Sequence, residues 1–326
     1  RYDSPAAELL VDPASGAVTG VRTASGARVA ARRGVVLATG GFEGDPDLVR
    51  THLGLDDVPV WGSTAATGDG LRMAQRVGAD LWHMDNMMAV NGISEPGSRH
   101  GHFAMFLHSR GLIWVDDSGR RFVDELVPSG HGQAVIGGRY VLHPHRPMHV
   151  IFDERTRRAG PISPGPEVLA VGWNVLTNGY RWSADNSSEI EAGWIHRADS
   201  LEELAAVTGL PAEAVVESVA AYNAACAAGH DDAFGRSPAT LVPITEPPFH
   251  AYRSGPLLAW TNGGPRRDEH ARVLDTAGGV IDGLYAAGTV SSTYSWAKDG
   301  GFHIADAIVF GRIAGAHAAG RATDVA

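Results

Sequence analysis

GLYAAG, residues 283–288, followed by GGFHIAD, residues 300–306, is the stretch that decides the fold of this chain. The apolar residues of the first part predict a buried strand, and the paired glycines of the second predict a helix that begins near Gly301. First-turn N–H groups of a helix have no helical partner and can hold an anionic or carbonyl-rich group. The order of strand, loop and helix therefore indicates a ligand-binding helix start, although a purely structural helix cap gives the same pattern.

The composition predicts a globular protein of two domains. The chain has 326 residues, of which 44% are hydrophobic and 20% are charged, and this is enough to bury a large core. The net charge of -10, with only 27 dispersed Lys and Arg residues, argues against a nucleic-acid partner. No stretch has the roughly 20 apolar residues of a membrane span, so we expect no membrane partner and a cytoplasmic location.

Cys226 is the single cysteine, so no internal disulfide and no thiolate metal cluster can form. It lies in an alanine-rich helical stretch, where a free thiol usually acts as a small apolar side chain. The 41 glycines indicate tight turns and close backbone approaches, which suit a cofactor-binding α/β protein.

The amino-terminal part of the chain reads as strands. Residues 7–11, 17–22 and 27–31, separated by Ser-Gly turns, predict an antiparallel meander. The apolar stretch GVVLA, residues 34–38, predicts a strand buried on both faces of a parallel sheet. Glycines at the end of that strand would let the backbone approach a ligand.

Several later residues predict where helices begin and end. Asp45–Pro46 predicts an N-cap and a first helical residue, and residues 67–70 predict the opening of a second helix that ends near Gly78. Apolar residues three and four apart predict helices over 201–210 and 212–228, with Ser200 and Pro211 at their starts. Because residues 85–249 are richer in histidine, proline and loops than the flanking parts, we expect them to form a second domain that interrupts the first.

Four motifs together make the chain resemble the FAD-dependent fumarate reductase, succinate dehydrogenase and 3-ketosteroid dehydrogenase flavoproteins. They are VVLATGGF (35–42), TGDG (67–70), GRRFVDE (119–125) and the block running from TNGG (261–264) through ARVLD (271–275) to FGRIAG (310–315). The resemblance implies an α/β fold: a discontinuous Rossmann-like FAD-binding domain, residues 1–84 and 250–326, with an inserted α+β cap domain, residues 85–249.

The same resemblance implies a set of cofactor contacts. They come from the turn after the strand at 35–37, from the second helix, from the TNGG block and from the final strand and helix: Ala38, Thr39, Gly40, Gly41, Asp69, Trp260, Gly288, Thr289, Gly301, His303 and Ile304. Amide groups at the last helix start would stabilise negative charge on the flavin as it is reduced. Thr289 replaces the acidic residue expected there to bind the ribityl chain.

A glycine fingerprint G-x-G-x-x-G is absent from the 326 residues. Dinucleotide-binding domains place this motif after their first strand, where it holds the pyrophosphate. We therefore expect an amino-terminal segment or a complementing chain to supply it, and the 326 residues alone to hold FAD poorly.

The reaction implied by the resemblance is hydride transfer between flavin N5 and a carbon next to a carbonyl or carboxylate of a small molecule. Lys298 stands where the fumarate branch has an arginine, and it is a candidate proton donor or anion anchor; a solvated loop lysine is the alternative. Tyr294 is a second candidate acid, or a packing residue with a polar tip. Ala259 and Trp260 replace the histidines of the fumarate branch, which suggests a less polar substrate.

The predicted cap domain adds further candidates. Arg121 and Glu125 correspond to a proton-delivery position of the dicarboxylate branch, but Pro128 replaces the arginine that should follow, which favours a plain ion pair. His108 and His131 are candidate acids. His-x-His spacings can bind metal, but helical His-x-x-x-His pairs and acidic triads are lacking, so we expect no metal. The histidines in question are His100, His102, His108, His131, His143, His145 and His149.

Two other kinds of protein stay open at this point. The first is a non-catalytic or incomplete flavoprotein fragment that acts as a binding module. The second is a metal-dependent hydrolase that uses the cap histidines, although the sequence has no Gly-x-Ser-x-Gly motif.

Overall fold

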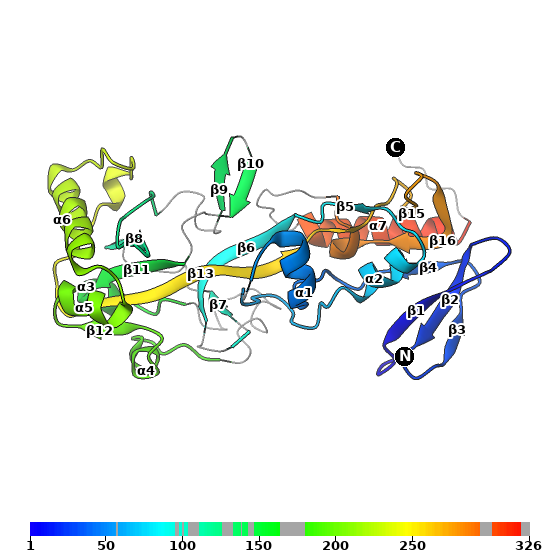
Figure 1. Ribbon diagram of the computed structural model, residues 1–326, viewed down its shortest axis with the longest axis horizontal. Helices are drawn as coiled ribbons and strands as arrows, with labels where there is room; N and C mark the ends of the chain where they lie inside the picture. The colour runs from blue at the N-terminus through cyan, green and yellow to red at the C-terminus, as the bar shows by residue number, and fades with distance from the viewer. Residues whose placement is uncertain are drawn as a thin grey trace. The chain divides into compact units, whose positions relative to one another are not determined.

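The computed structural model describes residues 1–56, 58–94, 98–99, 101–103, 111–125, 133–137, 139–142, 147–163, 180–293 and 302–320. The chain divides into two compact units whose elements are labelled in Figure 1. Unit 1 consists of Arg1–Asp57, Gly62–Met88 and Leu258–Ala326, and unit 2 of Val58–Trp61 and Ala89–Leu257. Each is described by itself.

Unit 1 begins with the predicted meander. Strands β1 (Ala6–Val11), β2 (Val18–Thr23) and β3 (Arg28–Ala30) pair antiparallel in chain order, as the dark blue strands of Figure 1 show. Leu9 and Val18 are buried with side chains of the following strand and helix. The meander expected from the sequence is therefore confirmed.

A parallel pair of strands lies at the centre of unit 1. Strand β4 (Val35–Leu37) pairs parallel with β16 (Val280–Ala286), and β16 pairs antiparallel with β15 (Arg272–Leu274). The parallel pairing is as predicted, but burial on both faces is wrong, because Val36 is 39% exposed. In the described sheet β4 is an edge strand.

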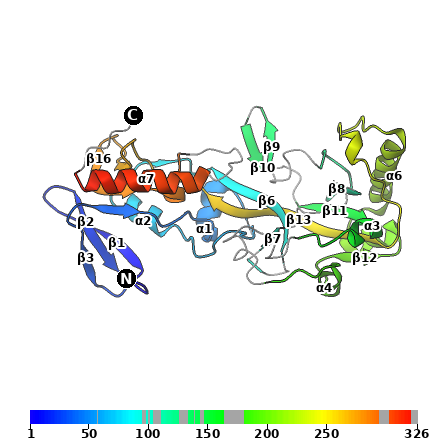
Figure 2. The ribbon, with the colours of Figure 1, turned by 180° about the vertical axis from the view of Figure 1, so that it is seen from behind.

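The helices of unit 1 begin where the sequence predicts. The Asp45 side chain accepts a hydrogen bond from the Leu48 amide and caps α1 (Pro46–Leu48), which continues into a π-helical turn (Val49–Leu53). Gly68 adopts the left-handed conformation before α2 (Asp69–Arg76), whose apolar face is buried. The last helix, α7 (Phe302–Ala318), packs on β16 through Ala314 and Tyr285 (Figure 2).

Unit 2 is built on a β-sheet. The described sheet has the order β7 (Gly101–Phe103), β6 (Met87–Ser94), β13 (Phe249–Thr261), β11 (Met148–Asp153) and β8 (Leu112–Asp116), and β12 (His196–Ala198) pairs with β13. The described pairings between β6 and β7, β13 and β11, β11 and β8, and β12 and β13 are antiparallel. The remaining strands form short pairs, β9 (Gln133–Ile136) with β10 (Arg139–Leu142), and in unit 1 β5 (Leu81–Trp82) with β14 (Gly264–Pro265).

The helices of unit 2 confirm the sequence periodicity. They are α3 (Glu154–Arg158), α4 (Ser187–Glu191), α5 (Leu201–Thr208) and α6 (Ala212–Ala228). Ser200 caps α5 and Pro211 precedes α6, and Cys226 packs against the apolar core on which α6 lies. Within the described ranges, every helix is too short or too polar to cross a bilayer.

Candidate functional site

The glycine turn, which we define as residues 38–44, leaves the carboxyl end of β4. Ala38 and Thr39 are exposed, and Gly40 has a φ of 77°, a conformation that side chains rarely adopt. A Cβ on Gly41 would collide with the hydroxyl of Thr261 and the carboxylate of Glu43. The turn therefore offers bare backbone and two small exposed residues at the end of a parallel strand.

A buried carboxyl group holds this turn to the end of β13. The Thr261 amide and hydroxyl donate hydrogen bonds of 3.2 and 3.1 Å to Glu43 Oε2, and the Phe42 amide donates one of 2.8 Å to Thr261 Oγ1. Glu43 is only 5% exposed, and burial raises its pKa to about 7 in spite of these hydrogen bonds. Sequence reasoning missed Glu43; an acidic residue directly after Gly-Gly-Phe was the available signal.

The start of α2 lies against the same turn. A Cβ on Gly70 would collide with the Thr39 hydroxyl, and the Gly68 amide donates to the Gly41 carbonyl at 3.1 Å. Asp69 is exposed and accepts a hydrogen bond of 3.2 Å from the Thr67 hydroxyl. The structure thus brings together Thr39, Gly41 and Asp69, which are separate in the sequence.

The side chains of Trp260 and His303 contact each other. The indole Nε1 of Trp260 donates a hydrogen bond of 2.6 Å to His303 Nε2, and the two rings meet edge to face at 4.9 Å. An accepting Nε2 carries no proton, so this contact favours the neutral imidazole. In the next position Ile304 is 67% exposed, and Gly301 lies outside the described residues.

An ion pair that sequence reasoning missed holds α7 to the end of β16. Asp306 accepts hydrogen bonds from the Gly288 amide at 2.9 Å and from Arg267 Nη2 at 2.5 Å. Arg267 Nη1 donates to the Ala286 carbonyl at 2.9 Å. The Gly288 amide is therefore engaged within the protein, and a contact from Gly288 to a ligand would use other atoms. The sequence feature that could have indicated this ion pair was an acidic residue, Asp306, inside the apolar helical stretch 302–318.

Arg121 and Glu125 lie in unit 2 within what we call the ionic cluster, formed by Arg121, Glu125, Asp231 and Arg236. Arg121 donates to both Glu125 oxygens at 2.7 and 3.0 Å, and its Nη2 lies 2.8 Å from Asp231 Oδ2. Arg236 Nη1 lies 3.0 Å from Glu125 Oε2. The side chains of Glu125 and Arg236 are fully buried.

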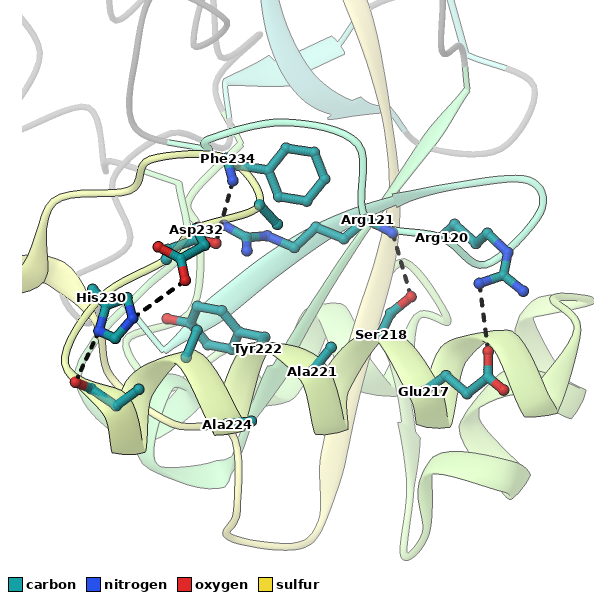
Figure 3. Close-up of a pocket in the computed structure, with 14 residues that line it drawn as sticks. Arg120, Arg121, Glu217, Ser218, Ala221, Tyr222, Ala224, His230, Asp232 and Phe234 are labelled. Atoms are coloured by element: carbon teal, nitrogen blue, oxygen red, sulfur yellow. Dashed lines mark hydrogen bonds and ion pairs between the residues drawn. The ribbon is translucent and has the colours of Figure 1, made fainter.

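Aromatic rings and a pocket surround this cluster. The Arg121 guanidinium lies 4.7 Å from the Phe234 ring centroid and 5.1 Å from that of Tyr222, and Figure 3 shows these rings on either side of it. The adjoining pocket has a volume of about 600 Å³, and its lining belongs to unit 2. Burial opposes the charge of Arg121, but Glu125 and Asp231 outweigh it and raise the pKa of Arg121.

Several predicted residues lie outside the described part of the chain. They are Tyr294, Lys298 and His108 among the catalytic candidates, and His100, His131, His143 and His145 among the other histidines. His149 is described, and its Nε2 lies 3.4 Å from Asp117 Oδ1, while burial lowers its pKa. The described residues include no group of three or more His, Cys, Asp or Glu side chains suited to a metal ion.

Comparison with known proteins places these features in a family. A family model described as FAD binding domain matches residues 1–301. NADH:acrylate oxidoreductase of Vibrio harveyi is 31% identical over 329 residues, covering 96% of this chain and 30% of that protein. Vinyl phenol reductase of Lactiplantibacillus plantarum is 30% identical over 339 residues, covering 97% of this chain and 67% of that protein.

A solved structure agrees with the sequence relatives. The crystal structure of 3-ketosteroid delta1-dehydrogenase from Sterolibacterium denitrificans matches with a TM-score of 0.73 and 27% identity, covering 97% of this chain and 59% of that one. This chain therefore spans between 30 and 67% of the length of these three proteins. The resemblance and the α/β fold expected from the sequence are confirmed, and the chain belongs to the FAD binding domain family, whose cofactor is FAD.

Proposed function

We propose that the protein containing this chain is a FAD-dependent oxidoreductase that adds or removes hydrogen across a C–C bond next to a carbonyl or carboxylate. The observation that carries this is the family match over residues 1–301, together with relatives named for an acrylate, a vinyl phenol and a 3-ketosteroid. A binding module without catalysis and a histidine-based hydrolase are not favoured by any of these relatives.

The residues of unit 1 fit a flavin dinucleotide. In open α/β sheets, ligands bind outside the carboxyl ends of parallel strands, and here those ends carry the bare glycine turn and the start of α2. We assign the cofactor contacts to this turn, to Asp69, and to Trp260, Thr289, His303 and Ile304 near α7. Bound FAD would supply hydride transfer at its N5 atom.

The chain's own residues would position the cofactor and the substrate. Asp306 and Arg267 hold the 3₁₀ turn Gly288–Ser291 in place, so that Thr289 is presented on a fixed backbone. First-turn amides of α7 would favour negative charge on a bound ring. Unit 1 would be the FAD-binding domain and unit 2 the cap domain.

The catalytic assignments are also proposals. Lys298, Tyr294 and His108 are the candidates for moving a proton to or from the substrate. We assign Arg121 and Glu125 to the ionic cluster, as a structural support of the cap, because the Arg121 guanidinium is bound by two carboxylates and its raised pKa disfavours proton release.

Further polypeptide is proposed to cover exposed apolar side chains of unit 1. Val36 on β4 and Ile304, Ile308 and Val309 on α7 are 39 to 67% exposed, which is unusual for large apolar side chains that share one part of a domain. A preceding segment or a complementing chain that carries pyrophosphate-binding glycines would bury them. The cytoplasmic location stays a prediction from composition.

The function is tested with flavin spectra and turnover. The longest natural form of the protein is purified, mixed with FAD and reduced with dithionite, with the 326-residue chain alone in parallel. In the longer form, bound flavin absorbance that bleaches is expected, and it should reoxidise with an acrylate, an enone steroid or a vinyl phenol. The longer polypeptide, which would include the covering segment, should bind more FAD per protein molecule than the 326 residues alone. Absence of bound, reducible flavin in the longest natural form of the protein would overturn the proposal.

A further inference from the structure

Glu43 has an environment that differs from those of the other acidic side chains described so far. It is nearly fully buried, and its described hydrogen bonds come from its own backbone amide and from Thr261, neither of which has a charge. Within the described ranges no ion pair reaches its carboxyl group. A buried carboxylate without a cation is destabilised relative to the neutral acid, because its charge has left water uncompensated.

The charged groups on the neighbouring elements do not compensate for it. Arg72 on α2 is bound by Asp45 at 2.6 Å and by the Thr67 carbonyl at 2.7 Å. The His52 ring meets the Phe42 ring at 5.7 Å, and burial lowers the pKa of His52. Among the described residues of the same region, Asp69 at the start of α2 is exposed, and His303 is bonded to Trp260.

The carboxyl group also determines the shape of the proposed cofactor site. Gly41 lies so near the Glu43 carboxylate that a Cβ on Gly41 would overlap it. Thr261 connects the carboxylate both to the Phe42 amide and to the TNGG block. A change of charge on Glu43 therefore acts directly on the glycine turn and on the end of β13. An anionic ligand bound at this turn would favour the neutral form by ordinary Coulomb repulsion.

We propose that Glu43 is a positioning residue that is protonated in the FAD-bound protein, so that binding of the anionic cofactor takes up a proton. The inference rests on the proposed function only for the identity of the ligand. Because burial raises the pKa of Glu43 to about 7, the folded protein loses stability as pH rises from the ordinary glutamate range towards 7. Above that range both folded and unfolded chains are ionised, and the loss is complete.

The first measurement is thermal unfolding of the full chain without FAD between pH 5 and 8. Glu43→Gln keeps the shape and the accepting oxygen but removes the titration. Its melting temperature should equal that of the wild type near pH 5 and exceed it near pH 8. A purely structural role would shift the melting temperature equally at every pH, and this result would overturn the inference.

The second measurement is FAD affinity at pH 6 and pH 8, by flavin fluorescence and by calorimetry in buffers of different ionisation enthalpy. The wild type should bind about tenfold more weakly at pH 8, with proton uptake, whereas Glu43→Gln should show neither effect. FAD binding that is independent of pH in the wild type would overturn the inference and leave the proposed function intact. These measurements use the longest natural form of the protein, and no FAD binding by that form at any pH would overturn the proposed function instead.

A second variant keeps the inference open to refutation if Glu43→Gln does not fold. Thr261→Val removes the hydroxyl that donates to the carboxylate and should move the pH transition of unfolding to higher pH, whereas Thr261→Ser should leave it in place. An unmoved transition in Thr261→Val would contradict the role given to Glu43.

Discussion

Glu43 in unit 1 and Glu154 in unit 2 are both buried, but their pKa values move in opposite directions. Glu43 in unit 1 is hydrogen-bonded by an uncharged threonine, and burial raises its pKa to about 7. Glu154 in unit 2 is bonded by Arg157 at 2.6 Å, which together with His250 lowers its pKa to about 2. The comparison teaches that burial alone does not decide the protonation state of these two glutamates; the cations beside Glu154 make the difference between them.

The difference follows from where each residue lies. Glu125, Asp231 and Glu154 all have arginine partners in unit 2, and these partners lower the pKa of Asp231 and of Glu154. Glu43 joins a glycine turn to a strand end that we propose to receive an anionic cofactor. A permanent negative charge would oppose that ligand, and an arginine partner would fill the space that a bare backbone turn provides.

The largest expected effect is in the ionic cluster. Arg236→Ala leaves Glu125 buried with Arg121 as its one remaining cation of the cluster, and should lower the free energy of unfolding by about 3–5 kcal/mol. Urea denaturation measures this. A loss below about 1 kcal/mol would mean that the cluster is not the support of unit 2 that its geometry indicates.

Glu154→Gln should have the next largest effect, and its pH dependence should be opposite to that of Glu43→Gln. The lowered pKa of Glu154 contributes stability above the ordinary glutamate range, which is lost as pH falls towards 2. The variant should therefore lose about 2–3 kcal/mol at pH 7 and approach the wild type in acid. Denaturation at pH 7 and pH 3 tests the sign; a constant difference would contradict it.

A smaller effect is expected from the backbone of the glycine turn. Gly41→Ala places a Cβ against Thr261 and Glu43 and should cost about 1–2 kcal/mol and weaken FAD binding. Gly255→Ala is the matched control, because a Cβ there meets nothing within 4 Å. Equal unfolding midpoints for the two variants would show that the turn has room for a side chain.

The smallest effect is expected next to the ionic cluster, at the surface. Arg120 pairs with Glu217 at 3.4 Å, with side chains 65 and 54% exposed. Arg120→Ala should change the free energy of unfolding by less than about 1 kcal/mol, because solvent screens the pair. Arg120→Ala is measured by the same urea denaturation as Arg236→Ala. If both variants lose the same free energy of unfolding, buried and exposed arginines of this region do not differ in their contribution to stability.

Much of the local structure could be predicted from the sequence. The meander, the capped helices at Asp45 and Ser200, and the parallel strand before Thr39 all follow from residue periodicity and turn residues, which act over a few positions. The exposure of Val36 could not be predicted, because it depends on which element lies beside β4. The contacts of Lys298, Tyr294 and His108 stay predictions.

By itself, the sequence determined the family, the FAD cofactor and the order of elements, because glycine turns and helix starts are local features. Only the tertiary structure decided that Glu43 meets Thr261, that Asp306 meets Arg267 and that Arg121 is held among two carboxylates and two rings. Apart from Arg121 and Glu125, which are four residues apart, these partners are far apart in the chain. The free energy of a charged group depends on the atoms that surround it after folding, and the linear order of residues does not state which atoms those are.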